Sequence, residues 1–414
     1  MTSPVPPGAA PQSSSSVAIS TFSRPGHGTR NRWGAVALMA AATFIVVAAE
    51  MMPVGLLTPM SASLAEREGT IGLSLTITGL VAAVTAPFIP IVTGRVDRRA
   101  TLIALMVLVA AANALTAISG TFLVLAAARV LLGLSMGGVW ALAASLAPRL
   151  VGARAVGLAT TVIFSGIALA SVLGVPIGTY VGAVLGWNAV FWGLAIAAAL
   201  IALTMATTLP AMPSEEAVPL NVLVLAFRNP GVRAGLAITA LLVTGHFSAY
   251  TYVRPALEVV AGLGAPAIGT LLVFYGALGV VGNFAAGAPA AKMPRGVIVG
   301  LSLGLVCVLA LFPSLATATV AAAVLMAAWG FFYGGISVST QAWIARAAPE
   351  QRESVAALWV SVFNASIALG AFAGGRMLDS MGPSPVFLVS AGIGATAFLV
   401  AIIRTPESDA RRVS

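Results

Sequence analysis

The stretch LAASLAPRLVGARAVGLA, residues 142–159, has a counterpart in WIARAAPEQRESVAALW, residues 343–359. In each stretch a proline ends one apolar segment, and an arginine-bearing turn precedes the next. The offset of 201 residues that superposes these stretches also produces identities elsewhere. Residues that match at this offset include Arg32 with Arg233, Gly133 with Gly334, Ala144 with Ala345, Pro148 with Pro349 and Gly174 with Gly375. A chance alignment of Ala-, Gly- and Leu-rich segments would not reproduce both loops as well, so the pattern predicts two homologous halves.

The composition predicts that a lipid bilayer surrounds both halves. Of 414 residues, 59% are hydrophobic and 8% charged, whereas about a quarter of a soluble domain is charged. An apolar run of about 20 residues crosses a bilayer as a helix with internal backbone hydrogen bonds. The sequence predicts an all-α membrane protein of about twelve such helices, at residues 33–57, 70–91, 101–119, 121–144, 156–183, 187–207, 234–255, 266–290, 296–313, 317–341, 354–377 and 383–403.

Six spans fall in each half, which defines the predicted domains. These are a disordered cytoplasmic tail (1–32), an N-terminal six-helix bundle (33–207), a cytoplasmic connector (208–232), a C-terminal six-helix bundle (233–404) and a cytoplasmic tail (405–414). With the amino terminus inside, 17 Lys and Arg residues face inward and 4 outward. Because cytoplasmic loops retain positive charge, we expect both termini in the cytoplasm of a bacterial plasma membrane.

Several function classes have no support in the residues. The net charge of +9 is scattered over loops, whereas nucleic-acid binding needs it clustered on one face. The sole lysine, Lys292, does not follow a glycine-rich phosphate loop, so transport would be secondary. Cys307 is the only cysteine, and His27 and His246 are the only histidines, too few for a metal centre. We therefore expect no cofactor, no metal and no enzyme activity, and a monomer that handles a small molecule and protons.

Two charged residues lie inside predicted spans. Glu50 occurs in FIVVAAEMMPVGLLTPM, residues 44–60, and Arg129 begins RVLLGLSMGG, residues 129–138. A charge at the bilayer centre costs about 2.5–3.5 kcal/mol, so we expect both side chains to face each other across a cavity. Burial favours a neutral carboxyl and a guanidinium favours the carboxylate, which makes Glu50 a candidate proton carrier. The alternatives are a structural Glu50 and an Arg129 that reaches lipid headgroups.

Other residues are candidates for gating and helix packing. GRVDRR, residues 94–99, places Asp97, Arg98 and Arg99 in an inner loop, where they could latch the cytoplasmic side or simply anchor the loop. In the fourth span, Gly133 and Gly137 would let another helix approach closely. In the fifth span, SVLGVPIG (171–178) combines close packing with a kink, which would suit a rocking interface between the halves; its residues are Gly174, Pro176 and Gly178.

Polar and aromatic residues in the spans are candidates for substrate binding. Aromatic rings stack on flat heterocycles, and amide or imidazole groups bond their edges. The candidates are Asn113, Trp140, His246, Tyr250, Tyr333 and Asn364. We expect Trp343, near an inner loop, to be an interface anchor instead. Arg254, near the outer end of the seventh span, would guard the outer mouth or meet headgroups.

These motifs carry a family resemblance. RVLLGLSMGG and SVLGVPIG resemble the fourth- and fifth-helix motifs of the drug:proton antiporter branch of the major facilitator superfamily. EMMPVGLLTPM (50–60) and AYTYVRP (249–255) resemble the bacterial purine ribonucleoside efflux permeases. The resemblance implies the major facilitator fold and proton-coupled efflux of purine ribonucleosides or their analogues, with possible antibiotic resistance. The alternatives are efflux of an amphenicol-type drug or a sugar, and a solute sensor that does not transport.

Overall fold

A computed structural model describes residues 32–92, 96–212 and 227–404. Within them, twelve helical segments are long and apolar enough to cross a membrane, which confirms the predicted all-α architecture and the predicted spans. Most of the predicted amino-terminal tail, the middle of the connector and the carboxy-terminal tail lie outside the described residues.

The first six spans form the N-terminal bundle. Several helices run beyond their predicted ends, because the helix continues past the apolar run that predicts it. Their bounds are α1 (Trp33–Leu64), α2 (Glu68–Val92), α3 (Arg98–Ala117), α4 (Phe122–Leu150), the 3₁₀ turn η1 (Ala153–Ala155), α5 (Val156–Leu169), the π-helical turn η2 (Ala170–Gly174), α6 (Val175–Leu185) and α7 (Trp187–Thr208).

The last six spans form the C-terminal bundle. The seventh and tenth spans, predicted as single helices, are each interrupted, by Thr251 and Tyr252 and by Gly335 respectively. The elements are α9 (Pro230–Tyr250), α10 (Val253–Ala261), α11 (Ala265–Lys292), α12 (Pro294–Leu315), α13 (Thr319–Gly334), α14 (Ile336–Ala347), the 3₁₀ turn η3 (Pro349–Gln351), α15 (Arg352–Met381) and α16 (Pro383–Ile403).

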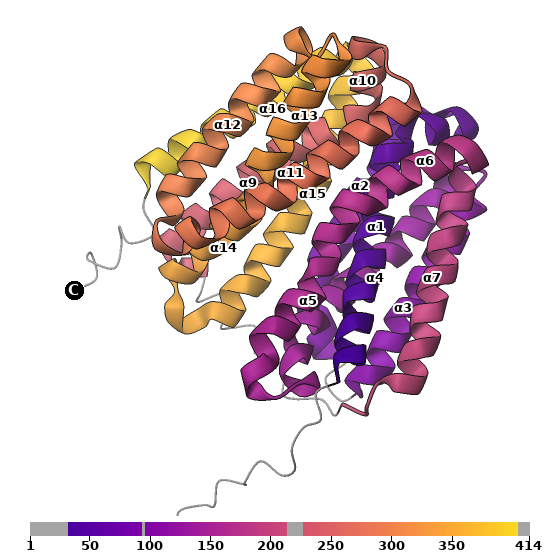
Figure 1. The fold of residues 1–414 in the computed structure, drawn as a ribbon, viewed down its shortest axis with the longest axis vertical. Helices are drawn as coiled ribbons and strands as arrows, with labels where there is room; N and C mark the ends of the chain where they lie inside the picture. The colour runs from indigo at the N-terminus through magenta and orange to yellow at the C-terminus, as the bar shows by residue number, and fades with distance from the viewer. Residues whose placement is uncertain (1–31, 93–95, 213–226, 405–414) are drawn as a thin grey trace, which may run out of the picture.

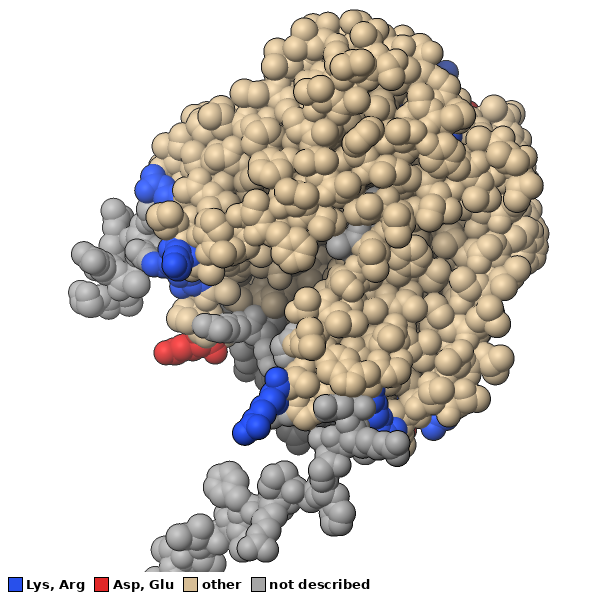
Figure 2. All heavy atoms as spheres, viewed as in Figure 1, with Lys and Arg blue, Asp and Glu red and all other residues tan. Residues whose placement is uncertain are grey.

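The two bundles stand side by side, indigo to magenta and orange to yellow in Figure 1. They meet where α2 packs on α15 and where α6 and η2 pack on α11. We call the end that carries Arg32 and Arg404 the terminal end, and the end that carries α10 and the turns at Gly186 and Gly382 the opposite end. In the space-filling view the surface is hollowed between the bundles toward the terminal end, and Lys and Arg side chains lie beside the hollow (Figure 2).

The repeat found in the sequence is present in the packing. A Cβ added to Gly133 on α4 would meet the carbonyl of Thr78 on α2, and one added to Gly334 on α13 would meet the carbonyl of Gly279 on α11. Both members of the second pair lie 201 residues after those of the first. Equivalent helices therefore cross at equivalent glycines in the two bundles, which supports their common origin.

Pro176 and its neighbouring glycines shape the fifth span. Proline has no amide hydrogen to donate within a helix, and here the chain widens into the π turn η2 just before it. A Cβ at Gly174 would meet Ala48, and one at Gly178 would meet Met52, both on α1. This glycine face therefore packs inside the N-terminal bundle. The segment that carries these glycines also reaches the other half, where η2 and α6 pack on α11, so a part in movement between the halves stays a prediction.

Candidate functional site

Glu50 lies at mid-length of α1 and is almost completely enclosed. Its side chain is 3% exposed, and its Oε1 atom has no hydrogen-bond partner among the described residues. The helix around it is buried from Val46 to Leu57. A carboxyl group in such surroundings is costly unless it is neutral or paired, so its position calls for a functional explanation.

Pro53 explains where Arg129 binds. Because Pro53 has no amide hydrogen, the carbonyl of Ala49, four residues earlier, lacks its usual helical donor. Arg129 on α4 supplies one: its Nη1 donates to the Ala49 oxygen at 3.0 Å. The guanidinium is 1% exposed, and its carbon lies 5.0 Å from the centre of the Phe191 ring on α7, a distance at which a cation attracts an aromatic face.

Glu50 and Arg129 lie close together but are not joined. The structure has no ion pair between them, although both belong to the described residues; Arg129 instead bonds the backbone one residue before Glu50. The two charges are within Coulombic range of each other. The Nε and Nη2 atoms of Arg129 have no partner in the described part of the chain. These two donors point the same way and form a fork that fits a carboxylate.

The C-terminal bundle contributes a group of stacked rings, which we call the aromatic cluster. His246 is its centre: its ring stacks on Tyr333 at 3.3 Å between centroids, on Tyr250 at 5.0 Å and on Tyr275 at 6.2 Å. The indole of Trp329 meets the imidazole edge-on at 5.6 Å. The cluster consists of His246, Phe247 and Tyr250 on α9, Tyr275 on α11, and Trp329 and Tyr333 on α13.

Hydrogen bonds decide which nitrogen of His246 carries the proton. Trp329 Nε1 lies 3.0 Å from His246 Nδ1, and an indole N–H can only donate. His246 Nδ1 is therefore the acceptor and has no hydrogen. In the neutral ring the proton is then on Nε2, which lies 3.3 Å from the Tyr275 hydroxyl. His246 is held as a single neutral tautomer, the form that stacks without bringing a charge into the bundle.

Tyr333 connects the aromatic cluster with Glu50. Its residue is half-buried, while its hydroxyl is buried and has no partner within the described segments. The hydroxyl is within Coulombic range of Glu50 in the other bundle. A half-buried ring and two buried oxygens, the Tyr333 hydroxyl and Glu50 Oε1, which have no hydrogen-bond partner among the described residues, therefore occur within Coulombic range of each other.

The other predicted substrate residues lie elsewhere. Trp140 pairs with Phe164 within the N-terminal bundle, with ring centroids 6.0 Å apart. Asn113 and Asn364 are buried, and the amide nitrogen of each donates to its own helix, at the carbonyls of Val109 and Val360. Their Oδ1 atoms have no partner in the part of the chain described. Each amide oxygen could therefore still accept a hydrogen bond.

Trp343 corrects a further expectation. It was predicted to anchor the protein at the membrane interface, but its side chain is fully buried. Its Nε1 donates to the carbonyl of Gly231 at 3.0 Å, which ties α14 to the start of α9. The nearby polar loop suggested a position at the membrane interface, but Trp343 lies on the face of α14 that points into the bundle.

The predicted gating residues pack at the terminal end of the N-terminal bundle. Asp97 accepts from the amide of Arg99 at 2.8 Å and from that of Met212 at 2.9 Å, and so caps α3. Arg99 also donates through its side chain to the carbonyl of Ala206, near the end of α7, where the helix dipole favours a cation. Arg98 is buried beside them. Gly137, like Gly133, admits α2 against α4.

Three members of the aromatic cluster, Phe247, Tyr275 and Trp329, were not predicted. The available signal was spacing: Trp329 precedes Tyr333 by four residues, as His246 precedes Tyr250, and residues four apart share a helix face. Tyr275 has no such neighbour in the sequence. Its place in the cluster depends on how α11 crosses α13.

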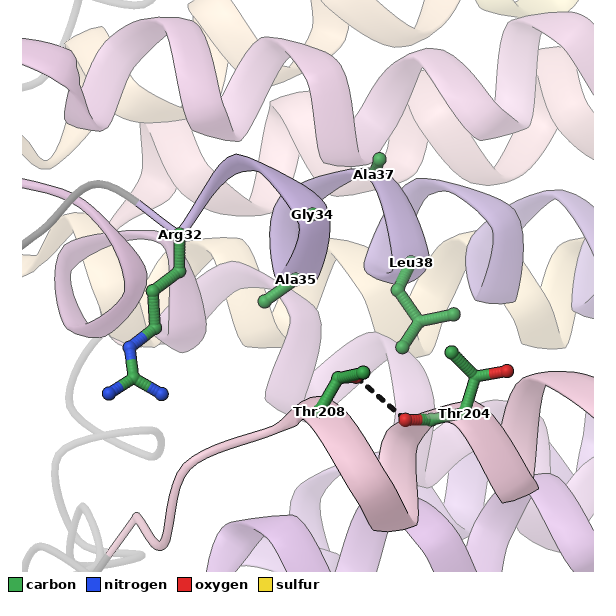
Figure 3. Close-up of a pocket in the computed structure, with 7 residues that line it drawn as sticks. All are labelled: Arg32, Gly34, Ala35, Ala37, Leu38, Thr204 and Thr208. Carbon is green, nitrogen blue, oxygen red and sulfur yellow. Dashed lines mark hydrogen bonds between the residues drawn. The ribbon is translucent and has the colours of Figure 1, made fainter.

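A groove of about 690 Å³ on the outside of the N-terminal bundle is separate from this site. Figure 3 shows it between α1 and α7 near the terminal end, with Arg32 at one edge and Leu38 facing Thr204 across it. The hydroxyl of Thr208 donates to the Thr204 carbonyl at 2.6 Å. Neither Glu50 nor any residue of the aromatic cluster lines this groove.

Comparisons with known proteins agree with this geometry. The family model described as Major Facilitator Superfamily matches residues 39–356 and 290–414. The purine ribonucleoside efflux pump NepI of Salmonella paratyphi C is 32% identical over 90% of this chain and 94% of its own. The transcription regulatory protein OpdE of Pseudomonas aeruginosa is 33% identical over 90% of this chain and 93% of its own.

Solved structures share the fold at low identity. A bacterial homologue of the human lysosomal transporter Spinster, inward-facing and unoccupied, superposes with a TM-score of 0.68 at 16% identity, over 91% of this chain and 96% of that one. The human organic anion transporter MFSD10 gives a TM-score of 0.65 at 17% identity, over 88% and 98%. With twelve spans, two pseudo-symmetric bundles and a family match along the chain, the protein belongs to the major facilitator superfamily of multi-pass membrane transporters.

Proposed function

We propose that the protein is a proton-coupled secondary transporter that exports purine ribonucleosides or their analogues by alternating access. The observation that carries the proposal is the buried Glu50 carboxyl, whose Oε1 has no hydrogen-bond partner among the described residues, near an arginine whose Nε and Nη2 donors likewise have none there. The similarity to the efflux pump NepI and the aromatic cluster on the facing bundle support the choice of cargo.

Glu50 would carry the proton. A buried carboxylate without a partner costs several kcal/mol, so the arrangement is stable when Glu50 is protonated. On losing its proton, the carboxylate would move the short way to the Nε and Nη2 donors of Arg129, where a bidentate pair compensates the charge. Arg129 is already held beside it by the carbonyl of Ala49. Glu50 thus has one stable position for each protonation state.

The aromatic cluster would receive the cargo. Purine rings are flat and stack on aromatic faces at about 0.5–1.5 kcal/mol beyond their buried area. The half-buried Tyr333 ring offers such a face, and its free hydroxyl can bond a ring edge or a ribose hydroxyl. Because Tyr333 is within range of Glu50, cargo bound there would compete with the proton, which is the requirement for antiport.

The predicted orientation says to which side of the membrane the hollow opens, while the inward proton gradient would drive the cargo outward. If the terminal end faces the cytoplasm, as its Lys and Arg residues favour, the hollow of Figure 2 opens toward the cytoplasm. Cargo would enter there as the proton leaves Glu50. A proton arriving from the other side would then return the carrier to the conformation described.

The test is the accumulation of labelled inosine in everted membrane vesicles, with and without an acid interior. We expect gradient-driven accumulation by the wild type, and its loss in Glu50→Gln while exchange of labelled for unlabelled inosine persists. Glu350→Gln, an exposed residue of η3, is the matched control and should behave as the wild type. Normal accumulation by Glu50→Gln would exclude Glu50 as the coupling site.

The same assay separates the alternatives. Accumulation of an amphenicol or a sugar but not of inosine would keep the mechanism and reject the cargo. The name of OpdE, a transcription regulatory protein, makes a sensor the second candidate. Binding of inosine without movement of any solute would favour that function.

A further inference from the structure

The two bundles are joined by hydrogen bonds at the opposite end. Asp379 on α15 accepts from the amide of Gly69 at 3.0 Å, at the start of α2, where a carboxylate also complements the helix dipole. Tyr180 and Thr270 share a hydrogen bond between α6 and α11. These contacts close the gap between the bundles on the side away from the hollow. We call this closed gap the opposite mouth.

A second proline in α1 leaves a carbonyl without its helical donor at one of these contacts. Pro59 cannot donate to the carbonyl of Gly55, four residues earlier, just as Pro53 leaves that of Ala49 free. Arg254 on α10, in the other bundle, donates to the Gly55 carbonyl through Nη1. Its Nε forms an ion pair with Glu258 at 2.9 Å, one helical turn away. Arg254 is 7% exposed, so this bond is shielded from water.

A single hydroxyl joins two carboxyl groups beside that contact. Thr58 Oγ1 lies 2.7 Å from Glu258 Oε2 in the C-terminal bundle and 3.0 Å from Glu68 Oε1 on α2. A hydroxyl has one hydrogen and can donate to only one of them. Glu258 is the acceptor at the shorter distance, and its other oxygen is paired with Arg254. If the single hydrogen of Thr58 goes to Glu258, a hydrogen bond between Thr58 and Glu68 would take its hydrogen from Glu68.

Of the other groups near Glu68, the carboxylate of Asp379 favours the protonated state, whereas cations such as Arg254 favour the ionised one. Asp379 brings a third carboxylate toward Glu68, and the exposed Arg67 precedes Glu68 in the chain. Tyr252, between α9 and α10, donates its hydroxyl to the carbonyl of Ala371 at 2.6 Å.

We propose that Pro59, Arg254, Thr58, Glu258 and Glu68 form a proton-linked latch that holds the opposite mouth closed, with one proton taken up by Glu68 on closing. When the mouth opens, Thr58 and Glu258 separate and water reaches Glu68. A solvated glutamate is ionised above about pH 4.3. The closed state binds more protons, so acid favours the closed mouth and alkali favours the open one. This latch is distinct from Glu50 and does not depend on the cargo.

Distances between spin labels on the two bundles test the latch. Labels are placed at Ser63 on α1 and Ser380 on α15, both exposed at the opposite end, after replacing Cys307. The protein is measured in lipid nanodiscs without cargo at about pH 5 and about pH 8, which span the titration of a partly buried glutamate. In the wild type we expect the short distance to dominate in acid and the long distance to increase in alkali.

Two substitutions separate the parts of the latch. In Pro59→Ala the restored amide competes with Arg254 for the Gly55 carbonyl, so the ratio of long to short distances should rise by about tenfold at both pH values. Pro313→Ala in α12 restores a helix bond far from the latch and is the control. Glu68→Gln keeps a donor toward Thr58 without titrating, so it should stay closed at both pH values.

Three results would overturn the proposal. The first is a wild-type distance distribution that does not respond to pH. The second is a Pro59→Ala distribution equal to that of Pro313→Ala. The third is a full pH response in Glu68→Gln. Thr58→Val removes the shared hydroxyl at similar side-chain size, so it should open the mouth at both pH values. This variant replaces Pro59→Ala in the test if Pro59→Ala does not fold. None of these measurements uses inosine, so failure of the proposed cargo leaves the test intact.

Discussion

At the scale of the residue, the two prolines of α1 serve the same purpose. Each removes a hydrogen bond within the helix and leaves a carbonyl that needs a donor in an apolar environment. The carbonyl of Ala49 receives Arg129 of the same bundle, and that of Gly55 receives Arg254 of the other. One arginine is thereby positioned at the proposed proton site and the other at the opposite mouth.

His246 provides a residue-scale prediction. With Trp329 donating to Nδ1, the imidazole should stay neutral across about pH 5 to 8, the range in which an ordinary histidine titrates. In Glu50→Gln protein we therefore expect the Kd for inosine, measured by calorimetry, to change by less than about twofold across this range. A larger change that disappears in His246→Gln would show that His246 does titrate.

At the scale of the element, the contact between α5 and α1 depends on a missing side chain. A Cβ at Gly166 would collide with the carbonyl of Ala40 and with Thr43, both on α1. The hydroxyl of Thr43 in turn donates to the carbonyl of Ile163 at 2.7 Å. Because backbone atoms cannot move aside as a flexible side chain can, the two helices would have to separate.

This contact predicts different effects for two glycine substitutions. Gly166→Ala should lower the free energy of unfolding by about 1–3 kcal/mol through overpacking. Gly193→Ala in α7 is the control, because its Cβ would meet nothing within 4 Å, and it should be neutral or stabilising by up to about 1 kcal/mol. Thermal denaturation in detergent compares the two. Equal melting temperatures would contradict the close approach of α5 to α1.

At the scale of the whole molecule, the two ends differ although the halves are related. Bonds between the bundles gather at the opposite end, and the hollow lies toward the terminal end. Alternating access requires two conformations, one open at each end of the molecule. Because the two halves are related, the same helices that now meet at the opposite end could instead meet at the terminal end. The mechanism therefore depends on contacts that exist in one arrangement and not in the other.

Orientation in the membrane is the whole-molecule prediction. In a variant without Cys307, a cysteine at Ser380 of the opposite end should react with a membrane-impermeant maleimide in intact cells. A cysteine at Glu350 of the terminal end should react only after the cells are permeabilised; both positions are exposed. The physical reason is retention of the Lys- and Arg-rich end in the cytoplasm. The reverse labelling pattern would contradict the predicted orientation.

The sequence by itself determined the number of spans, the two related halves and the family. The free energy of transferring a segment into lipid is nearly the sum of the contributions of its residues. Hydropathy therefore predicts the spans without knowledge of the helices that pack on them. The offset of 201 residues is likewise present in the structure, where equivalent helices of the two bundles cross at equivalent glycines. Glu50 and Arg129 could be singled out for the same reason, because an ionisable residue inside a span is conspicuous in any register.

Only the tertiary structure decided which partners these residues have. Hydropathy does not say how a buried helix is rotated about its axis or where it crosses its neighbours. Both depend on the side-chain contacts between the helix and each neighbour, which a single segment of sequence does not contain. Arg129 thus binds the Ala49 carbonyl instead of Glu50, Trp343 turns inward, and the glycines of the fifth span face α1. Tyr275 joins the aromatic cluster, and Thr58 meets Glu68 and Glu258, for the same reason: each position brings together helices far apart in the chain.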